Sequence, residues 1–253
     1  MDPQDRLCLY YPSIFAGHPR LAAAESTRKG GVSKPPYDSL NLGIHTADRP
    51  GAIAENRRRF FAACGFSPDQ TAGSHQRHGS EILLVEQPGY VEGYDALISN
   101  QPGILLTVTI ADCTPILLFD PVTEAFAAIH AGWKGTAAGI AGKTLKALEK
   151  HFATKPSDCL AYIGTCIDHC DFEVDADVAD HFTISHKKWE AGKNKFFVDL
   201  KAANKDELQR AGIPDQNIQV SPHSTYTRHQ DYFSHRFEKG TTGRMLAAIG
   251  LRP

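Results

Sequence analysis

The sequence has no long apolar run. Its longest apolar-rich stretch, 104–110, resumes at 115–119 and is interrupted by Asp112. Because a membrane-spanning helix needs about 20 mostly apolar residues, we expect no contact with a membrane. The first 15 residues also lack the basic segment and the apolar segment of a secretion signal. These absences predict a cytoplasmic protein.

An excess of one charge is absent as well. The chain carries 27 basic and 29 acidic side chains, for a net charge of −2. Proteins that bind nucleic acid usually concentrate positive charge on one face, so we expect no nucleic-acid partner. Internal repeats and low-complexity tracts are also missing, and no segment rich in glycine or proline marks a linker.

Cysteine is present in moderate number. An even count invites a disulfide interpretation, but a chain of this length without an export signal is expected to keep its thiols reduced. At least one thiol is then available as a metal ligand or a nucleophile. The six cysteines are Cys8, Cys64, Cys113, Cys159, Cys166 and Cys170.

Short strands and helices are mixed along the chain. Strands rich in Ile, Leu and Val are expected at 104–110, 115–119 and 125–129, and a helix at 136–151, where apolar positions recur every three or four residues. Because strands and helices do not alternate regularly, we expect an α/β fold of α+β character, with mixed sheets flanked by helices. Further helices are expected at 54–64 (ended by Gly65), 174–182 and 202–211, and further strands at 9–15, 81–86, 160–163, 218–221 and 245–251.

Three segments place reactive side chains beside predicted strand ends. His78 precedes a strand, Cys113 lies in the break between two strands, and His130 follows a strand. Zinc binds imidazole and thiolate readily, and catalytic zinc sites use three protein ligands and leave a fourth position open. The residue types therefore predict a zinc site at His78, Cys113 and His130.

Other interpretations of these residues stay open. A cysteine between apolar runs is most often a small buried residue, and His75 competes with His78 as a ligand. Cys166, His169 and Cys170 could form a second metal site, although their spacing is not that of a zinc knuckle.

Short motifs spread over nearly the whole chain strengthen the metal-site interpretation. In their order and spacing they resemble the laccase-domain or "polyphenol oxidase" family, whose members are also described as purine nucleoside phosphorylases and peptidoglycan editing factors. The motifs are Thr27-Arg28, Gly30-Gly31-Val32-Ser33, Ser39-Leu40-Asn41-Leu42-Gly43-x-His45, Glu55-Asn56-Arg57, Gln76-x-His78-Gly79, Ala111-Asp112-Cys113-x-Pro115, His130-Ala131-Gly132-Trp133-Lys134-Gly135, Phe233-Ser234-x-Arg236 and Thr242-Gly243-Arg244.

The resemblance implies a single catalytic domain over 1–253, with His78, Cys113 and His130 as metal ligands. Zinc is the usual metal of the family, and copper is claimed for some members. The implied activity is phosphorolysis of adenosine, inosine, guanosine or methylthioadenosine, with adenosine deamination as a side activity. Two departures, at Ile163-Gly164-Thr165 and Ser224-Thr225, leave the preferred nucleoside open. The oligomeric state is also left open.

The partners expected from this resemblance are a purine nucleoside and phosphate. The predicted catalytic residues are Cys113, His130 and Asp112, the last as a carrier of protons or as a turn cap. Arginine forks suit phosphate oxygens, and Arg28, Arg57, Arg236 and Arg244 are the arginine candidates, although a solvated surface charge is the favoured interpretation of Arg244. The predicted substrate-binding and phosphate-binding residues are Arg28, Asn41, His45, Arg57 and Arg236.

Three alternative functions compete with this one. In the first, a metal-free cysteine hydrolase or a peptidoglycan-precursor editing enzyme uses Cys113 as nucleophile and His130 as base. In the second, the protein is a copper-dependent phenol oxidase, although its twelve histidines include no His-x-His pair of the kind that multicopper sites need. In the third, it is a metal-holding interaction module.

Overall fold

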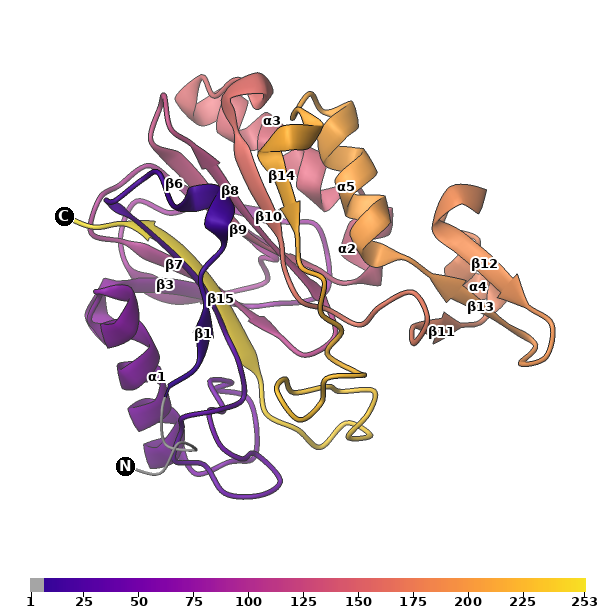
Figure 1. The fold of residues 1–253 in the computed structure, drawn as a ribbon. Coiled ribbons are helices and arrows are strands. Elements are labelled where there is room, and N and C mark those ends of the chain that lie inside the picture. The colour runs from indigo at the N-terminus through magenta and orange to yellow at the C-terminus, as the bar shows by residue number, and fades with distance from the viewer. Residues whose placement is uncertain (1–6) are drawn as a thin grey trace.

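Residues 7–253 of the computed structural model form two large sheets, a small third sheet and five α-helices (Figure 1). The first six residues of the predicted domain 1–253 lie outside the described residues. The first sheet, in strand order, consists of β1 (Leu9–Tyr10), β2 (Leu21–Ser26), β15 (Met245–Leu251), β7 (Leu105–Ile110), β3 (Thr71–His75) and β5 (Gly89–Glu92). The second consists of β14 (Ile218–Val220), β10 (Leu160–Ile163), β8 (Thr114–Asp120), β9 (Ala125–Ala131), β6 (Ala96–Ser99) and β4 (Ile82–Leu84). The third consists of β11 (Glu173–Val174), β13 (Lys195–Val198) and β12 (Lys187–Glu190).

Both large sheets are mixed, as predicted. In the first sheet β3 is parallel to β5 and β7, whereas β15 is antiparallel to β2 and β7. In the second, β10–β14 and β4–β6 are parallel pairs, whereas β8, β9 and β6 are joined by antiparallel pairing. A short turn joins β8 directly to the antiparallel β9, and strands β3 to β9 follow one another without an intervening α-helix, so strands and helices do not alternate along the sequence.

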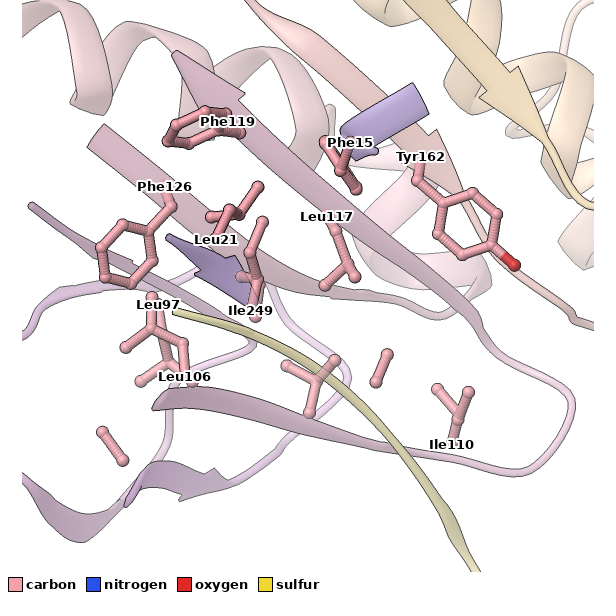
Figure 2. Close-up of a cluster of buried hydrophobic side chains, with 14 of the residues drawn as sticks. Phe15, Leu21, Leu97, Leu106, Ile110, Leu117, Phe119, Phe126, Tyr162 and Ile249 are labelled. Atoms are coloured by element: carbon pink, nitrogen blue, oxygen red, sulfur yellow. The ribbon is translucent and has the colours of Figure 1, made fainter. Parts of the chain in front are cut away.

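The core between the two sheets explains the apolar runs of the central strands. Along β8, Leu117 and Phe119 pack into the core between the sheets, whereas Ile116 and Leu118 pack on the outer face of the second sheet. Such a strand is buried on both faces, so its sequence reads as a continuous apolar run rather than an alternating one. Figure 2 shows side chains of both sheets meeting in this core.

Helices cover the outer faces of the two sheets (Figure 1). α1 (Pro50–Cys64) packs Phe60 and Phe61 on the first sheet. α3 (Ile140–Phe152) packs Leu145 and Leu148 on the second sheet, beside Leu208 of α5 (Leu200–Arg210). The predicted class, mixed sheets flanked by helices, is confirmed.

The predicted helix 54–64 begins earlier than expected, at Pro50. It ends as predicted, because Gly65 adopts the left-handed conformation, with φ of 85°. The predicted continuous helix 136–151 is wrong, because α2 (Trp133–Ala137) ends before Gly139, whose φ is 75°. α3 then starts afresh, and the Glu207 carboxylate accepts a hydrogen bond from the Gly142 amide in its first turn at 2.8 Å.

Two other local predictions are also wrong. The strand expected at 9–15 stops at Tyr10, and 13–15 form a single 3₁₀ turn after Pro12, which has no amide hydrogen to donate to a strand partner. The helix expected at 174–182 is divided between β11 and α4 (Ala176–Ala179). Pairing of β11 with β13, more than 20 residues away, overrides the local helical pattern.

The third sheet and α4 project from the body of the molecule (Figure 1). This small lobe has its own apolar cluster, which includes Val174, Phe182 and Val198. Within residues 7–253, no helix combines the length and the apolar character needed to cross a membrane.

Candidate metal centre

The three predicted metal ligands converge at one rim of the two-sheet body. His78 lies in the loop after β3, His130 lies near the end of β9, and Cys113 lies where the chain passes from β7 in the first sheet to β8 in the second. Their ligand atoms all lie within 4.8 Å of one another. His78 is exposed, Cys113 is half-buried and His130 is buried, so the group opens to solvent on one side.

Gln76 ties the His78 loop to the strand that precedes Cys113. Its amide donates to the Thr109 carbonyl at 2.9 Å and accepts from the Thr109 amide at 2.8 Å. The backbones of β3 and β7 pair at the first two residues of each strand. Beyond that point the Gln76 side chain links the two segments through its hydrogen bonds to Thr109. The glutamine of the Gln-x-His-Gly motif thus brings two ligand-bearing segments together.

The geometry suits a zinc ion. Zinc–nitrogen and zinc–sulfur bonds of about 2.0–2.3 Å place tetrahedral ligand atoms about 3.3–3.8 Å apart, a separation that the 4.8 Å group reaches with small side-chain shifts. Gly132 keeps this space open. A Cβ atom there would lie 3.1 Å from Cδ2 of His78 and 3.3 Å from Sγ of Cys113. One nitrogen from each histidine and the cysteine sulfur would hold the metal.

Asp95, which the sequence reasoning missed, holds two of the ligands in place. Its buried carboxylate accepts hydrogen bonds from the backbone amides of Arg77, His78 and Gly79, at 3.2, 3.0 and 2.8 Å. It also lies 2.8 Å from Nδ1 of His130. This contact leaves Nε2 of His130 for a metal, in the carboxylate–histidine–metal arrangement common at zinc sites.

Charges in the group favour the thiolate form of Cys113, whereas His130 has to release a proton before it can bind a metal. Burial alone would raise the pKa of the Cys113 thiol, but the His130 and His78 imidazoles lower it to about 6. Burial opposes protonation of His130, yet the Cys113 thiolate and Asp95 raise its pKa to about 9. The hydrogen bonds from His130 and the loop amides outweigh burial and lower the pKa of Asp95. The sulfur is therefore poised as a thiolate, the form that binds metals.

A cavity of about 460 Å³ opens over the three ligands, a volume typical of small-molecule sites. His45 and His75 stack in it with their ring centres 4.1 Å apart, and Nε2 of His45 lies 3.3 Å from the Tyr90 hydroxyl. Trp133 and Phe172 also line it. His75, the alternative ligand considered from the sequence, stacks on His45 and is not part of the metal group, which contains His78.

Asp112 also lines the cavity, with both carboxylate oxygens engaged. One accepts a hydrogen bond from the Thr225 hydroxyl at 2.5 Å and the other from the Arg236 amide at 2.7 Å. Its backbone has φ of 82°. These contacts join the segment before Cys113 to two loops far along the chain. The proton-carrying role of Asp112 stays a prediction.

The predicted substrate-binding residues divide into two groups. His45 and Arg236 line the cavity, whereas Arg28, Asn41 and Arg57 do not. Arg236 extends over the Phe172 ring, 5.6 Å from its centre, and Nη1 donates to the Glu173 carbonyl at 3.1 Å.

The other two arginines are held against the protein interior. Arg28 forms an ion pair with Glu238 at 3.1 Å and lies 4.5 Å from the centre of the buried Phe233 ring. Arg57 donates to the Leu42 carbonyl at 2.9 Å and covers the Phe61 ring. The Arg28 contacts join segments about 200 residues apart, and the Arg57 contacts tie α1 to the loop at Leu42, so both arginines stabilise the fold.

Asn41 is fully buried beneath the cavity. Its amide group donates to the Thr46 hydroxyl at 2.8 Å and to Asp48 at 3.1 Å. Its side-chain oxygen accepts from the amides of Gly43 and Arg244, at 3.1 and 2.9 Å. With these bonds made, Asn41 shapes the wall of the cavity.

Arg244, for which the sequence favoured a solvated surface charge, lines the cavity and is half-buried. It could not be told from a solvated arginine because its environment comes from segment 39–43, some 200 residues away. Asp95 gave no signal either, since a single acidic residue before a strand is usually exposed. The motif Thr242-Gly243-Arg244 was the one available indication of Arg244.

Cys166, His169 and Cys170, the alternative metal group left open by the sequence, do not come together as three ligands within residues 7–253. Cys166 is buried and Cys170 is exposed, and within residues 7–253 His78, Cys113 and His130 make up the one recorded group of three potential ligands. All six cysteines lie in this range, and none forms a disulfide there.

Comparisons with known proteins agree over nearly the whole chain. "Purine nucleoside phosphorylase YfiH" of Escherichia coli (strain K12) is 39% identical over 236 residues, covering 91% of this chain and 94% of that protein. "Purine nucleoside phosphorylase YlmD" of Geobacillus stearothermophilus is 37% identical over 254 residues, covering 94% and 92%. The crystal structure of YlmD from Geobacillus stearothermophilus superposes with a TM-score of 0.89 at 35% identity, covering 96% of this chain and 94% of that one.

A second solved structure, the Bacillus licheniformis hypothetical protein YfiH, also has a TM-score of 0.89, at 30% identity, covering 92% of this chain and 94% of that one. The model of the family "Multi-copper polyphenol oxidoreductase laccase" matches residues 22–252. The match includes all three ligands of the candidate metal centre. The chain therefore belongs to the multi-copper polyphenol oxidoreductase laccase family.

Proposed function

We propose that this protein is a zinc-dependent purine nucleoside phosphorylase. The observation that carries the proposal is the group of His78, Cys113 and His130 at the floor of a 460 Å³ cavity lined by cationic and aromatic side chains. Support also comes from curated relatives bearing that activity in their names, which align over more than nine-tenths of the chain. Adenosine, inosine, guanosine and methylthioadenosine are the proposed substrates.

In this reaction an oxygen of hydrogen phosphate forms a bond to the anomeric carbon of the ribose. The bond from that carbon to the purine nitrogen breaks, and its electron pair leaves with the base. The phosphate proton ends on the purine, so the products are the free base and ribose 1-phosphate. Catalysis requires that the two reactants be held in line and that the leaving purine be stabilised.

The residues of the cavity suit these tasks. A bound zinc ion would supply Lewis-acid stabilisation of charge that develops on the substrate. His78, Cys113 and His130 would hold it, while Asp95 fixes the orientation of His130 through Nδ1. The stacked His45 and His75 offer an aromatic face for the purine, beside the tilted ring of Tyr90. His45 and Arg236 are proposed to contact the substrates.

A cysteine hydrolase is the second candidate, and one observation favours it. The pKa of Cys113 is lowered to about 6 because His130 and His78 outweigh the effect of burial, and a thiolate beside an imidazole is what a cysteine nucleophile requires. A metal bound to the sulfur would prevent this role. A phenol oxidase has less support, since residues 7–253 contain one group of three metal ligands rather than several.

Product analysis tests the proposal. Purified protein is incubated with adenosine or inosine, with and without phosphate, beside a Cys113→Ala variant, and the products are identified by mass. Cys8→Ala is the matched control, because Cys8 is an exposed thiol outside the metal group. We expect free base and ribose 1-phosphate only with phosphate, with Cys8→Ala unaffected and Cys113→Ala inactive.

Other products would change the conclusion. Inosine formed from adenosine without phosphate would identify deamination at the same site. Free ribose formed without phosphate would identify hydrolysis and contradict phosphorolysis. Full activity of metal-free protein, lost on alkylation of Cys113, would favour the cysteine hydrolase.

A further inference from the structure

The cavity over the metal group carries an excess of positive and titratable nitrogen groups. Arg236, Arg244 and five histidines line it, whereas Asp112 is its one carboxylate. Both oxygens of Asp112 already accept hydrogen bonds from the protein. A cavity of this composition favours an anion, and the two arginines are held in different ways.

We propose that Arg244 binds the phosphate co-substrate and that Asn41 and Gly43 aim its side chain into the cavity. The assignment deepens the proposed phosphorylase function and rests on it for the identity of the anion. Arg236 is the weaker, outer contact.

The backbone around Arg244 is bonded to a loop from the other end of the chain. The Arg244 amide donates to the side-chain oxygen of Asn41 at 2.9 Å, and the Leu42 amide donates to the Arg244 carbonyl at 2.9 Å. The Gly43 amide shares the same Asn41 oxygen at 3.1 Å. Because Asn41 is fully buried, these bonds fix the point from which the Arg244 side chain leaves the backbone.

Gly43 makes room for that side chain. A Cβ atom at residue 43 would lie 2.6 Å from Cγ and 2.8 Å from Cβ of Arg244. These are the inner atoms of the side chain rather than its flexible end, so any larger residue at 43 would displace it. The Ser39-Leu40-Asn41-Leu42-Gly43 and Thr242-Gly243-Arg244 motifs thus form one structural unit.

The Arg244 guanidinium is held by hydrogen bonds, and the negative charges of Cys113, Asp112 and Glu238 act on it only from beyond ion-pair distance. Nη1 donates to the carbonyls of Thr242 and Gly243 at 2.9 Å each. Within residues 7–253, Nε and Nη2 make no recorded hydrogen bond, and no carboxylate lies in ion-pair distance of Arg244. A half-buried arginine without a counter-ion is costly, and a bound oxyanion that accepts two of its N–H groups would remove that cost.

The other arginines of the motifs lack this combination. Arg28 already has a carboxylate partner in Glu238 and lies outside the cavity. Arg57 also lies outside the cavity. Arg236 lines the cavity and, like Arg244, donates to a backbone carbonyl, but it is exposed. An exposed contact contributes less than a half-buried one.

Steady-state kinetics and phosphate titration test the assignment. The variants are Arg244→Gln, Arg244→Lys, Gly43→Ala and Arg236→Gln. Arg20→Gln is the control, because among residues 7–253 the exposed Arg20 side chain pairs with Glu124 alone and lies outside the cavity. Since a charge-assisted hydrogen bond is strong, we expect Arg244→Gln to raise the KM for phosphate roughly tenfold to a hundredfold. The KM for nucleoside should change less than about threefold. Arg244→Lys and Gly43→Ala should have smaller effects in the same direction, and Arg20→Gln none.

Binding of inorganic phosphate is measured separately by calorimetry, which needs no turnover. If the wild type binds phosphate, Arg244→Gln does not, and neither cleaves nucleosides, the anion site stands and the phosphorylase function fails. If Arg244→Gln is folded, keeps its metal and binds phosphate as the wild type does, the assignment is overturned. A phosphate KM raised tenfold by Arg236→Gln and unchanged by Arg244→Gln would also overturn it. If Arg244→Gln does not fold, Gly43→Ala decides in the same way.

Discussion

The two ends of the cavity are built differently. At the metal end, residues from strand ends of both sheets meet around one buried carboxylate, Asp95, which contacts His130 and the His78 loop. At the arginine end, Arg236 and Arg244 are carried by loops, and their backbone amides donate to the side chains of Asp112 and Asn41. The first end depends on a rigid junction between sheets, and the second on loops fastened to one another. Changes at the metal end should therefore affect metal affinity, and changes at the arginine end should affect substrate affinity or loop stability.

The largest effect is expected from Asp95→Asn. The amide can no longer accept all four hydrogen bonds, so the orientation of His130 and the His78 loop is lost, and the zinc dissociation constant should rise roughly tenfold to a hundredfold. Competition with a chelator of known affinity measures this change.

Asp120→Asn is the matched control for this measurement. Asp120 is another fully buried carboxylate, which accepts bonds from the turn residues Val122 and Thr123 at the far end of β8. It should lower stability and leave zinc affinity unchanged. Equal zinc affinity in Asp95→Asn and the wild type would contradict the central role of Asp95.

Gly132→Ala is expected to have a somewhat smaller effect at the same end. The added Cβ would lie 3.1 Å from Cδ2 of His78 and 3.3 Å from Sγ of Cys113. The ligands would have to move apart, and we expect zinc affinity to fall roughly tenfold, in line with the cost of overpacking. Gly51→Ala in α1, where no atom lies within 4 Å of the added Cβ, should retain full affinity. Unchanged zinc affinity in Gly132→Ala would show that the ligands do not need the space left by Gly132.

Arg28→Gln tests whether an arginine outside the cavity affects stability rather than phosphate binding. Because Arg28 joins Glu238, Asp38 and the His229 carbonyl, its loss should lower the free energy of unfolding by about 2 kcal/mol. The KM for phosphate should not change. Urea denaturation and steady-state kinetics measure the two quantities. A raised phosphate KM at unchanged stability would instead restore Arg28 as a phosphate ligand.

Much of the metal end could be predicted from the sequence. His, Cys and His at strand ends are recognisable by residue type, and the apolar runs locate the central strands. Asp95 could not be found in this way, because its burial depends on strands of both sheets coming together. The break at Gly139 was also missed, since the apolar positions of 136–151 fit a single helix and the capping Glu207 lies more than 60 residues away.

The arginine end could be predicted only as a list of candidates. Arg28, Arg57, Arg236 and Arg244 occur in similar short motifs, and nothing local distinguishes an arginine that joins loops from one that faces a cavity. The difference lies in their partners. Glu238 forms an ion pair with Arg28. For Arg244, Gly43 leaves room for the side chain and Asn41 accepts a hydrogen bond from the backbone amide.

The smallest effect concerns a buried carboxylate away from both ends. Burial raises the pKa of Glu25, against hydrogen bonds from Thr165 and Tyr162. The pKa of Glu25 is therefore higher in the folded state than its value of 4.5 in the unfolded chain. Between these two pKa values the unfolded chain loses the proton more readily than the folded protein, so the free energy of unfolding falls as the pH rises. Glu25→Gln should therefore gain stability relative to the wild type with increasing pH, by at most about 1.4 kcal/mol per unit. Urea denaturation between pH 4 and 8, at about unit steps, measures this. A constant difference would show that Glu25 keeps an ordinary pKa.

The most direct test of the account is metal titration of the metal-free protein, with phosphate-dependent release of purine from inosine as the readout. We expect activity to be absent without metal and to rise linearly to a plateau at about one zinc ion per chain, as one three-ligand site requires. Copper at the same ratio should be less effective, and Cys113→Ala should show no stoichiometric rise. Full activity in protein freed of metal would contradict the account, and so would a plateau at several metal ions per chain.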